Sequence, residues 1–273
     1  DNAGTNLERG RMGITWSPDS NWLAYAKAGD NGMKQIKVWS SGTNRVTAIT
    51  DPFADSFSPA WDLDHKHLYF LASTDGWANT SSMTARPNYA AYVINLAKKD
   101  ASPFKPKSDE EAVKKDKSSD KKDDKKKDAK KKPTAKKDKK VIIDFDGISR
   151  RIMALPLRGN YRSIIAGPAG FAFINEGSTV HKFDLKKLKA KEFGKGLNIY
   201  AVSANGKHMV VRAGRNWKVA KTAGPNAKSA KTLKLDFNMK LNRLKEWKQM
   251  FEEAWRYERD YFYDPGMHGR DWN

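Results

Sequence analysis

The sequence predicts a mainly β protein: about four β-propeller blades that form part of a larger propeller, followed by an amphipathic α-helix that starts a second domain. Short strand-like segments recur in groups of four about every 40 residues. The turn WSPDS (16–20) of the first group returns in altered form in later groups. After residue 242 the apolar spacing changes to the 3.6-residue period of a helix. Repeated four-stranded units of this length are typical of propeller blades, because one such sheet cannot cover both of its faces by itself.

The first unit consists of four predicted strands joined by short turns. The strands span residues 14–17, 22–26, 35–39 and 46–50. The third, QIKVW, alternates polar and apolar residues as a half-buried strand does. In the first turn, Pro18 restricts φ and the Asp19 side chain can bond the backbone, which tightens the connection. Trp16, Trp39 and Trp61 recur at blade positions, so we expect them to lie in the core between blades.

The second unit contains a long charged run. Its predicted strands span residues 58–62, 67–71, 89–94 and 141–145. Residues 105–140 are therefore an insertion between two strands of one blade, and not a linker between domains. This run consists almost entirely of Lys, Asp, Ser and Ala, and it cannot bury enough apolar area to offset the entropy of ordering. We expect it to be a disordered surface loop.

The charge of this run bears on nucleic-acid binding. The chain has a formal net charge of +20, and the run supplies eight of these charges through 17 lysines against nine acidic residues. A basic arm for nucleic acid or an acidic surface is one interpretation, and a solvated loop is the other. Arms that bind RNA combine arginine and aromatic residues for bidentate and stacking contacts, and this run has neither. We favour the solvated loop and do not expect nucleic acid as a partner.

Two more units and a helix complete the chain. The units lie near residues 161–193 and 199–235, and VSANGK (202–207) is a degenerate form of the first turn. We expect the helix to end at Asp264-Pro265-Gly266. The predicted domains are therefore residues 1–241, the blades with their loop, and residues 242–273, the start of a helical part. The apolar face of the helix comprises Leu244, Trp247, Met250, Phe251, Ala254, Trp255, Tyr261 and Phe262.

Several stretches resemble known proteins. WSPDSNWLAY (16–25) resembles the repeat of TolB-type propellers. EWKQMFEEAWR (246–256) and DYFYDPGMHG (260–269) resemble the first helix of the mixed core that follows the second propeller in tricorn-like serine peptidases. DFDGI (144–148), RIMALP (151–156) and a Lys-rich insertion before them are also similar to that family. The resemblance covers essentially the whole chain.

The resemblance implies a large serine endopeptidase. In that family, propellers gate or channel peptides, a PDZ-like domain follows the helical piece, and an α/β domain carries the nucleophile. The catalytic serine, its acidic partner and the active-site histidine lie beyond the helix matched here. The resemblance thus implies a non-catalytic portion of a peptidase, with no catalytic, cofactor-binding or metal-binding residue in this chain. The alternative is a stand-alone propeller that binds proteins or peptides without hydrolysis.

One histidine near the end of the chain could carry chemistry. His268 lies among Asp264, Met267 and Asp271, and could serve as a catalytic base. We interpret it as a turn residue at a domain junction, since the family's active-site histidine comes later. There is no cysteine, no Gly-x-Ser-x-Gly nucleophile motif and no Gly-rich phosphate loop before a helix. Gly167, Gly170, Gly194 and Gly196 have the spacing of turn glycines.

A second histidine group could bind a metal ion. His65 and His67 are spaced for one face of a strand, and Asp62 and Asp64 lie nearby. We interpret these four residues as a polar blade turn, and expect no cofactor. Asp19 and Asp184 are likewise interpreted as turn formers, and the remaining histidines, His181 and His208, lie in strand patterns.

The expected partners follow from the resemblance. They are peptide or unfolded-protein substrates, the remainder of the peptidase core, and further copies of the chain in a homo-oligomer. No segment is apolar enough to predict a membrane span. The chain starts at Asp1 and ends just after a turn, so we expect both ends to be cut edges of a longer polypeptide. The expected compartment is the cytoplasm, with the periplasm as the alternative.

Overall fold

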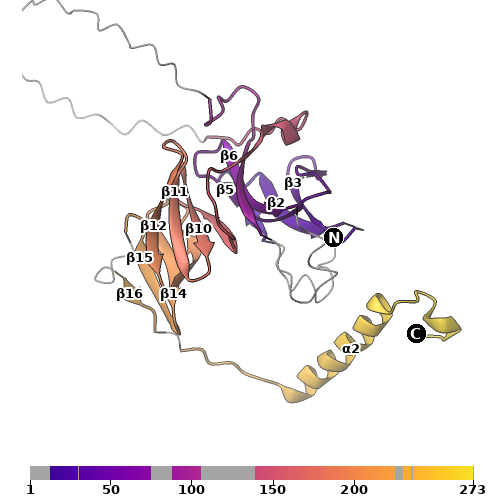
Figure 1. The fold of residues 1–273 in the computed structure, drawn as a ribbon. Coiled ribbons are helices and arrows are strands. Elements are labelled where there is room, and N and C mark those ends of the chain that lie inside the picture. The colour runs from indigo at the N-terminus through magenta and orange to yellow at the C-terminus, as the bar shows by residue number, and fades with distance from the viewer. Residues whose placement is uncertain are drawn as a thin grey trace, which may run out of the picture.

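The computed structural model describes residues 13–29, 31–74, 88–105, 139–224, 230–234 and 236–272. These residues form four antiparallel four-stranded sheets followed by a helix, α2 (Arg243–Tyr261) (Figure 1). We call the sheets blades A to D in chain order. Within each blade, neighbouring strands are consecutive in sequence, so the predicted fold of propeller blades followed by a helix is confirmed.

The strand bounds are as follows. Blade A contains β1 (Thr15–Trp16), β2 (Trp22–Ala28), β3 (Lys34–Ser40) and β4 (Val46–Ala48), and blade B contains β5 (Asp55–Trp61), β6 (His67–Ser73), β7 (Ala90–Asn95) and β8 (Ile152–Ala154). Blade C contains β9 (Ser163–Ala166), β10 (Phe171–Glu176), β11 (Thr179–Asp184) and β12 (Lys189–Lys195), and blade D contains β13 (Leu197–Val202), β14 (His208–Ala213), β15 (Asn216–Lys221) and β16 (Lys231–Thr232). Two short 3₁₀ helices are η1 (Ile148–Arg151) and η2 (Met267–Gly269).

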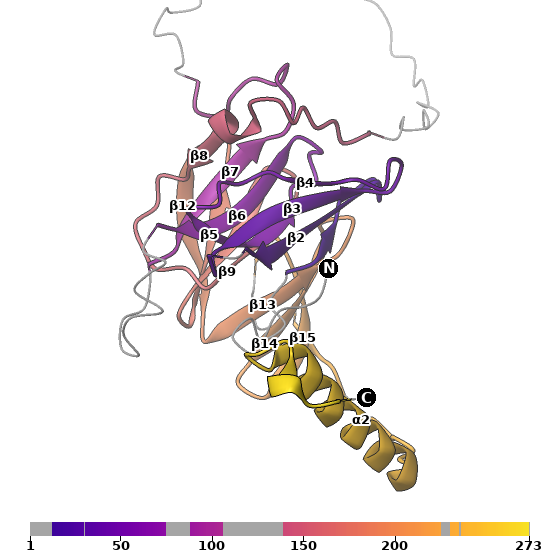
Figure 2. The ribbon, with the colours of Figure 1, turned by 90° about the vertical axis from the view of Figure 1, so that its right-hand side faces the viewer.

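The blades pack face to face in chain order, A on B, B on C and C on D (Figures 1 and 2). Three apolar clusters fill the interfaces. In the first, Ile36 and Val38 of blade A meet Trp61, Leu68 and Ile94 of blade B. All five side chains are nearly or completely buried, and burying one such side chain contributes about 1.5–3 kcal/mol. The hydrophobic core is therefore divided into layers between blades.

The turn between the first two strands repeats in every blade. Its fourth residue has a left-handed backbone in all four: Ser20 (φ 59°), His65 (φ 68°), Gly170 (φ 79°) and Gly206 (φ 68°). Its third residue is a side-chain acceptor in three blades, because Asp19, Asp64 and Asn205 each accept the backbone N–H two residues later. The predicted role of Asp19 as a turn former is confirmed.

Residues 141–145 are not a strand, contrary to the prediction; the fourth strand of blade B is β8. The backbone of this segment bonds across the ends of two blades. The Val141 N–H donates to Asp19 Oδ2 (2.8 Å), and the Asp144 N–H donates to the Leu96 carbonyl (3.0 Å). Ile143 and Phe145 pack against the core between blades A and B. Burial, and not ladder pairing, therefore explains the apolar pattern.

The charged run does lie inside blade B, between β7 and β8. Most of it, residues 106–138, is outside the described residues, so its predicted disorder stays a prediction. The returning segment is held by Arg151, whose guanidinium donates to the carbonyls of Asn95 (2.9 Å), Leu96 (3.2 Å), Asp146 (3.1 Å) and Asp144. One side chain thus closes the base of the insertion.

Helix α2 begins at the N-cap Asn242, whose side chain accepts the Lys245 N–H (3.2 Å), and it ends before Phe262. The helix extends away from the blades, and none of its residues is buried (Figures 1 and 2). Beyond it the chain folds back. The Trp255 indole donates to the Trp272 carbonyl (3.1 Å), and the Trp272 indole donates to the Trp255 carbonyl (3.3 Å). The predicted division of the chain at residue 242 stays a prediction.

Two details of the sequence prediction are wrong. Gly194 lies inside β12 beside a β-bulge, and not in a turn. Of the three tryptophans expected between blades, only Trp61 is buried there. Trp16 (52% exposed) and Trp39 lie on the outer face of blade A, the face turned away from blade B.

Among the described residues, no helix combines the length and the apolarity that a bilayer span demands.

Candidate functional site

The innermost strands of all four blades line a central cavity of about 600 Å³. Strand β1 of blade A, β5 of B, β9 of C and β13 of D supply its walls, and residues of the turns that follow β1, β5 and β13 also line it. The lining residues are Gly13, Ile14, Thr15, Trp16, Ser17, Pro18, Ser20, Ser58, Pro59, Ala60, Trp61, Leu63, Ile164, Ile165, Ala166, Tyr200, Ala201, Val202, Ser203 and Ala204. The cavity is the candidate functional site, since it is the place where all four blades meet.

Two of the innermost strands are bulged where they line the cavity. In β5 the register shifts between Phe57 and Ala60, and Ser58 has a φ of 57°. The Ser58 hydroxyl donates to the Ile164 carbonyl (3.2 Å) and accepts the Ile164 N–H (3.2 Å), which joins blade B to the inner strand of blade C. In β13 the shift lies beside Tyr200. A bulge re-aims side chains and interrupts pairing, which is why bulges are common beside binding sites.

Tyr200 is the large side chain at the second bulge. It is 50% exposed, and its ring packs on Trp217 at 4.6 Å between centroids. The Arg212 guanidinium lies over the other ring of this pair, 5.8 Å from the Trp217 centroid. Ile14, which also lines the cavity, is 61% exposed. Together with Tyr200 it gives the cavity accessible apolar and aromatic surface, whereas the ring of Trp16 packs on Trp39 at the outer face of blade A.

The described lining of the cavity contains no aspartate, glutamate, lysine, arginine or histidine. It therefore has no acid–base pair and no carboxylate or imidazole for a metal ion. Its polar groups are hydroxyls and main-chain amides, which can hydrogen-bond a polypeptide but do not activate water. The arrangement suits contact with a chain that passes or rests in the cavity, and it does not suit bond cleavage.

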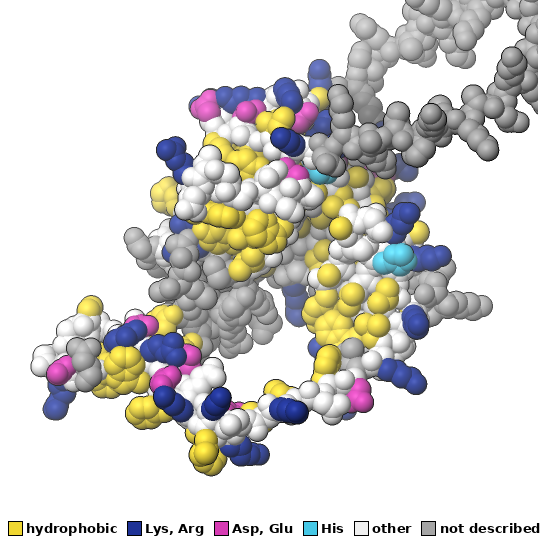
Figure 3. All heavy atoms as spheres, turned by 180° about the vertical axis from the view of Figure 1, so that it is seen from behind, with side chains coloured by type: hydrophobic (Ala, Val, Ile, Leu, Met, Phe, Trp, Pro, Cys, Tyr) yellow, Lys and Arg dark blue, Asp and Glu magenta, His cyan; other side chains and the backbone are white. Residues whose placement is uncertain are grey.

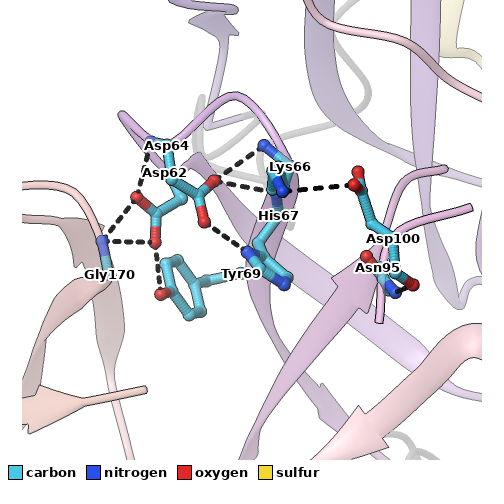
Figure 4. A network of polar contacts seen from close by, with 8 residues as sticks. All are labelled: Asp62, Asp64, Lys66, His67, Tyr69, Asn95, Asp100 and Gly170. Atoms are coloured by element: carbon cyan, nitrogen blue, oxygen red, sulfur yellow. Dashed lines mark hydrogen bonds and ion pairs between the residues drawn. The ribbon is translucent and has the colours of Figure 1, made fainter. Parts of the chain in front are cut away.

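Two aspartates that flank the lining residue Leu63, Asp62 and Asp64, belong to a network of polar contacts (Figure 4). Asp62, fully buried at the end of β5, accepts the Gly170 N–H of blade C (2.9 Å) and the Tyr69 hydroxyl (2.5 Å). Asp64 Oδ2 lies 2.5 Å from His67 Nδ1. The cluster joins blade B to blade C.

Burial raises the pKa of Asp62 to about 6, and the charge of Asp64 adds to this, while the bonds from Tyr69 and Gly170 act in the opposite direction. Burial alone would raise the pKa of Asp64 as well, but hydrogen bonding and charge from His67 hold it below its usual value. The two carboxyl groups thus differ in pKa because only one has a basic partner.

The structure brings together three of the four residues considered for a metal site. Asp62, Asp64 and His67 offer ligand atoms within 4.8 Å of one another. His65 is not among them. It was predicted to share a face of the strand with His67, but it lies in the turn before β6, so that prediction is wrong. A bound ion would have to displace Tyr69, Gly170 and the bond between Asp64 and His67. We keep the interpretation of a polar blade turn, and the absence of a metal site stays a prediction.

His268 lies in a compact turn after α2. Asp264 Oδ2 accepts the His268 N–H (2.7 Å) and lies 3.2 Å from His268 Nδ1, and His268 Nε2 contacts the Tyr263 hydroxyl. Met267 and His268 both have left-handed backbones. These contacts are all local to the turn, which agrees with the interpretation as a turn residue.

The other two histidines lie in strands, as predicted. His181 is in β11 and contacts Glu176 (3.0 Å), and His208 begins β14. The sequence analysis did not single out Ser58 and Tyr200. A signal was present for the first, because Pro59 inside an otherwise strand-like segment indicates a bulge. No local signal exists for Tyr200, whose register shift depends on its pairing with β14.

Two family models match the chain. One, described as the tricorn protease second beta propeller domain, matches residues 5–223. The other, described as the tricorn protease C1 domain, matches residues 244–273. The first covers most of the chain, and the boundary between the two matches falls shortly before α2.

Curated relatives and a solved structure agree with these matches. "Tricorn protease homolog 1" of Streptomyces coelicolor is 26% identical over 96% of this chain and 26% of its own length. "Tricorn protease" of Thermoplasma volcanium is 24% identical over 91% of this chain and 24% of its own length. The crystal structure of the tricorn protease superposes with a TM-score of 0.59 at 20% identity, over 92% of this chain and 25% of that one. The chain spans about a quarter of the length of these proteins, and it belongs to the tricorn protease family.

Proposed function

We propose that this chain is the non-catalytic propeller portion of a tricorn-type serine endopeptidase, and that its cavity forms part of a passage through which peptides are gated or channelled to an active site elsewhere in the longer protein. Family membership supports the peptidase part of the proposal. The chain's coverage of only about a quarter of its relatives supports the placement of the catalytic residues outside it.

The cavity carries the channelling part of the proposal. It lies where the innermost strands of four blades meet, and the part of its wall that the structure describes has exposed apolar side chains and hydroxyls but no acid–base group for cleavage. A volume of about 600 Å³ is within the usual range of ligand sites, roughly 300–1,000 Å³. The cavity is therefore large enough for part of an extended peptide.

A steric block tests this proposal in the full-length protein. Ala204 lines the cavity from the turn after β13 and is exposed, so Ala204→Trp would fill part of the space. We expect kcat/KM for long peptides to fall on the order of tenfold, because a narrowed passage hinders a long peptide from reaching its productive position at the active site. For very short peptides we expect a smaller fall in kcat/KM. Ala101→Trp is the matched control, because Ala101 is exposed and does not line the cavity. Equal behaviour of the two variants on long peptides would contradict channelling.

The stand-alone scaffold makes a different prediction about the gene. A peptidase portion requires codons for a serine peptidase domain beyond residue 273. A stop codon directly after Asn273, with no such domain in the same gene, would overturn the peptidase proposal and leave peptide binding alone. The oligomeric state and the compartment, cytoplasm or periplasm, stay predictions.

A further inference from the structure

We infer that the central cavity accepts peptide segments without regard to their charge. This inference rests on the proposed function, because it names the class of peptide that the same site takes. It starts from a contrast within the chain. Charged residues make up 31% of the sequence and its net charge is +20, yet the twenty lining residues that the structure describes include none.

The neutrality of the wall is built into the blade turns. Asp19 lies in sequence between the lining residues Pro18 and Ser20, and Asp62 lies between Trp61 and Leu63. Both carboxylates could have faced the cavity. Instead, Asp19 Oδ2 accepts the Val141 N–H (2.8 Å) and Asp62 accepts the Gly170 N–H (2.9 Å), and each of these bonds crosses to the next blade.

The carboxylates are therefore fully engaged away from the passage. Asp19 also accepts bonds from the Ser17 hydroxyl (2.6 Å) and the Asn21 amide (2.9 Å). Asp62 is completely buried. Because opposite charges attract strongly only at short range with little intervening water, neither acid contributes a binding partner for a cationic side chain in the cavity.

The size of the cavity keeps the cost of desolvating a charged peptide side chain small. About 600 Å³ corresponds to roughly twenty water volumes, so a charged side chain can keep much of its hydration there. Desolvation, which disfavours charge in a dry pocket, is then small. With neither attraction nor desolvation, apolar contacts with Ile14 and Tyr200 act on a peptide regardless of its charge.

The test inserts a single charge at Ala204 of the full-length protein. The variants are Ala204→Asp, Ala204→Lys and, for size without charge, Ala204→Asn. The substrates are three long peptides that share one scissile sequence and carry acidic, neutral or basic residues far from it. Each kcat/KM is divided by that of a very short peptide with the same scissile sequence, so that preferences of the active site cancel.

For the unmodified protein and Ala204→Asn we expect the three ratios to agree within about threefold and to be insensitive to salt, since the wall has no field to focus. For Ala204→Asp we expect the basic peptide to gain and the acidic one to lose, on the order of tenfold between them, and for Ala204→Lys the reverse. Both effects should shrink at high salt.

The outcomes separate this inference from the proposed function. A strong, salt-sensitive charge preference in the unmodified protein would overturn the inference. The inference would also be overturned if neither charged variant changed the charge preference while Ala204→Trp still impaired the cleavage of long peptides. In that case the channelling proposal itself would stand. If Ala204→Trp has no effect on long peptides, the channelling proposal fails and the inference fails with it.

Discussion

At the scale of single residues, one turn position shows how a small change joins two blades. Ser17 and Ser203 occupy the first position of the turn in blades A and D, and each hydroxyl accepts the N–H of the residue five positions later (3.0 Å in both). Blade B has Asp62 at this position. Its longer, ionisable side chain reaches Gly170 of blade C and the Tyr69 hydroxyl. The substitution converts a local turn contact into a contact between blades, at the cost of a buried carboxyl group.

This buried carboxyl group should make stability depend on pH. The folded-state pKa of Asp62 is about 6 against a usual 3.8, so the folded protein binds the proton more tightly than the unfolded chain. That contribution is fully present below pH 3.8 and is lost as the pH rises through 6. We expect the free energy of unfolding to increase by about 1 kcal/mol from pH 7 to pH 5 relative to Asp62→Asn.

Chemical denaturation of both proteins at several pH values measures this difference. Groups that do not interact with Asp62 titrate alike in the two proteins and cancel in the comparison, whereas the interaction of Asp62 with Asp64 is part of the measured difference. Asp62→Ser, which installs the residue of blades A and D, should also remove the pH dependence but weaken the contact with blade C. Parallel pH profiles for the unmodified protein and Asp62→Asn would contradict the assignment.

His65 gives a second prediction at this scale. It occupies the left-handed position that Gly170 and Gly206 occupy in blades C and D, and its Nδ1 is buried without a hydrogen-bond partner among the described residues. A left-handed backbone costs a non-glycine residue roughly 1–2 kcal/mol. Replacement by glycine removes this cost, but part of the gain is lost because glycine loses more conformational entropy on folding. We expect His65→Gly to raise the free energy of unfolding by about 0.5–1 kcal/mol, which corresponds to about 2–4 °C in Tm.

The reverse change is the control. Gly206→Ala keeps φ at 68° and places a Cβ 3.1 Å from Pro168 Cα, so it should lower Tm. If His65→Gly instead destabilises the protein, then packing of the imidazole ring outweighs the backbone strain.

At the scale of elements, contacts at the base of the insertion hold blade B together, so we expect the stability of the blade not to depend on the insertion itself. Arg151 ties its returning end to four carbonyl groups, and Val141 is bonded both by Asp19 and, through its carbonyl, by the Trp22 indole (3.3 Å). Asp146 accepts a bond from Lys98, which lies on the other side of the insertion. These contacts hold the base of the insertion whatever its length.

We therefore expect replacement of residues 108–138 by a short Gly/Ser linker to leave Tm almost unchanged. Arg151→Ala, by contrast, leaves partly buried carbonyls unpaired and should cost about 2–3 kcal/mol. Differential scanning calorimetry of the two variants compares them directly. A loss of several degrees in the deletion variant would show that the charged run itself is structural.

Helix α2 carries several large apolar side chains that are exposed. Trp247 is 57% exposed, Met250 62% and Phe251 74%. The periodicity of the sequence identified this helix, since its caps and apolar face are local features. Among the described residues, the helix is capped by Asn242 at its start, and the reciprocal bonds of Trp255 and Trp272 tie its last turns to the end of the chain.

At the scale of the whole molecule, no other described blade packs on the outer face of blade A or on that of blade D. Trp16, Leu23, Trp39 and Val46 are paired in a row across blade A. The corresponding row of blade B, formed by Trp61, Leu68, Ile94 and Ile152, is the one that packs against blade A. Figure 3 shows apolar side chains gathered on the blades and along the helix. The outer face of blade A thus has the composition of an interface between blades.

We expect the isolated chain to self-associate through such faces. Trp39→Lys should shift the sedimentation velocity distribution toward the monomer without lowering Tm, because Trp39 is only partly buried and lies outside the three cores. Trp61→Lys is the contrasting variant, since Trp61 is 4% exposed and bonds the Thr15 carbonyl (3.1 Å), and it should unfold the protein. Association that is indifferent to Trp39→Lys would place the contact elsewhere.

The sequence by itself determined the features that depend on local pattern. Spacing and turn chemistry predicted the four-strand repeat, the Asp19 turn, the place of the charged run between two strands and the helix after residue 242. The family was likewise evident from short motifs, because residues 246–269 combine a helix face with a distinctive turn.

Only the tertiary structure decided which residues meet across blades. Residues 141–145 look like a strand because they are apolar, but their backbone bonds lie on Asp19 and Leu96, far away in sequence. Trp16 and Trp61 end the first strands of blades A and B, yet one is exposed and the other buried, because, of these two blades, only B has a described blade packed on that side. The neutral cavity depends on where Asp19 and Asp62 point. Backbone bonding, burial and side-chain direction at these positions depend on packing between blades, and a local sequence pattern contains no information about that packing.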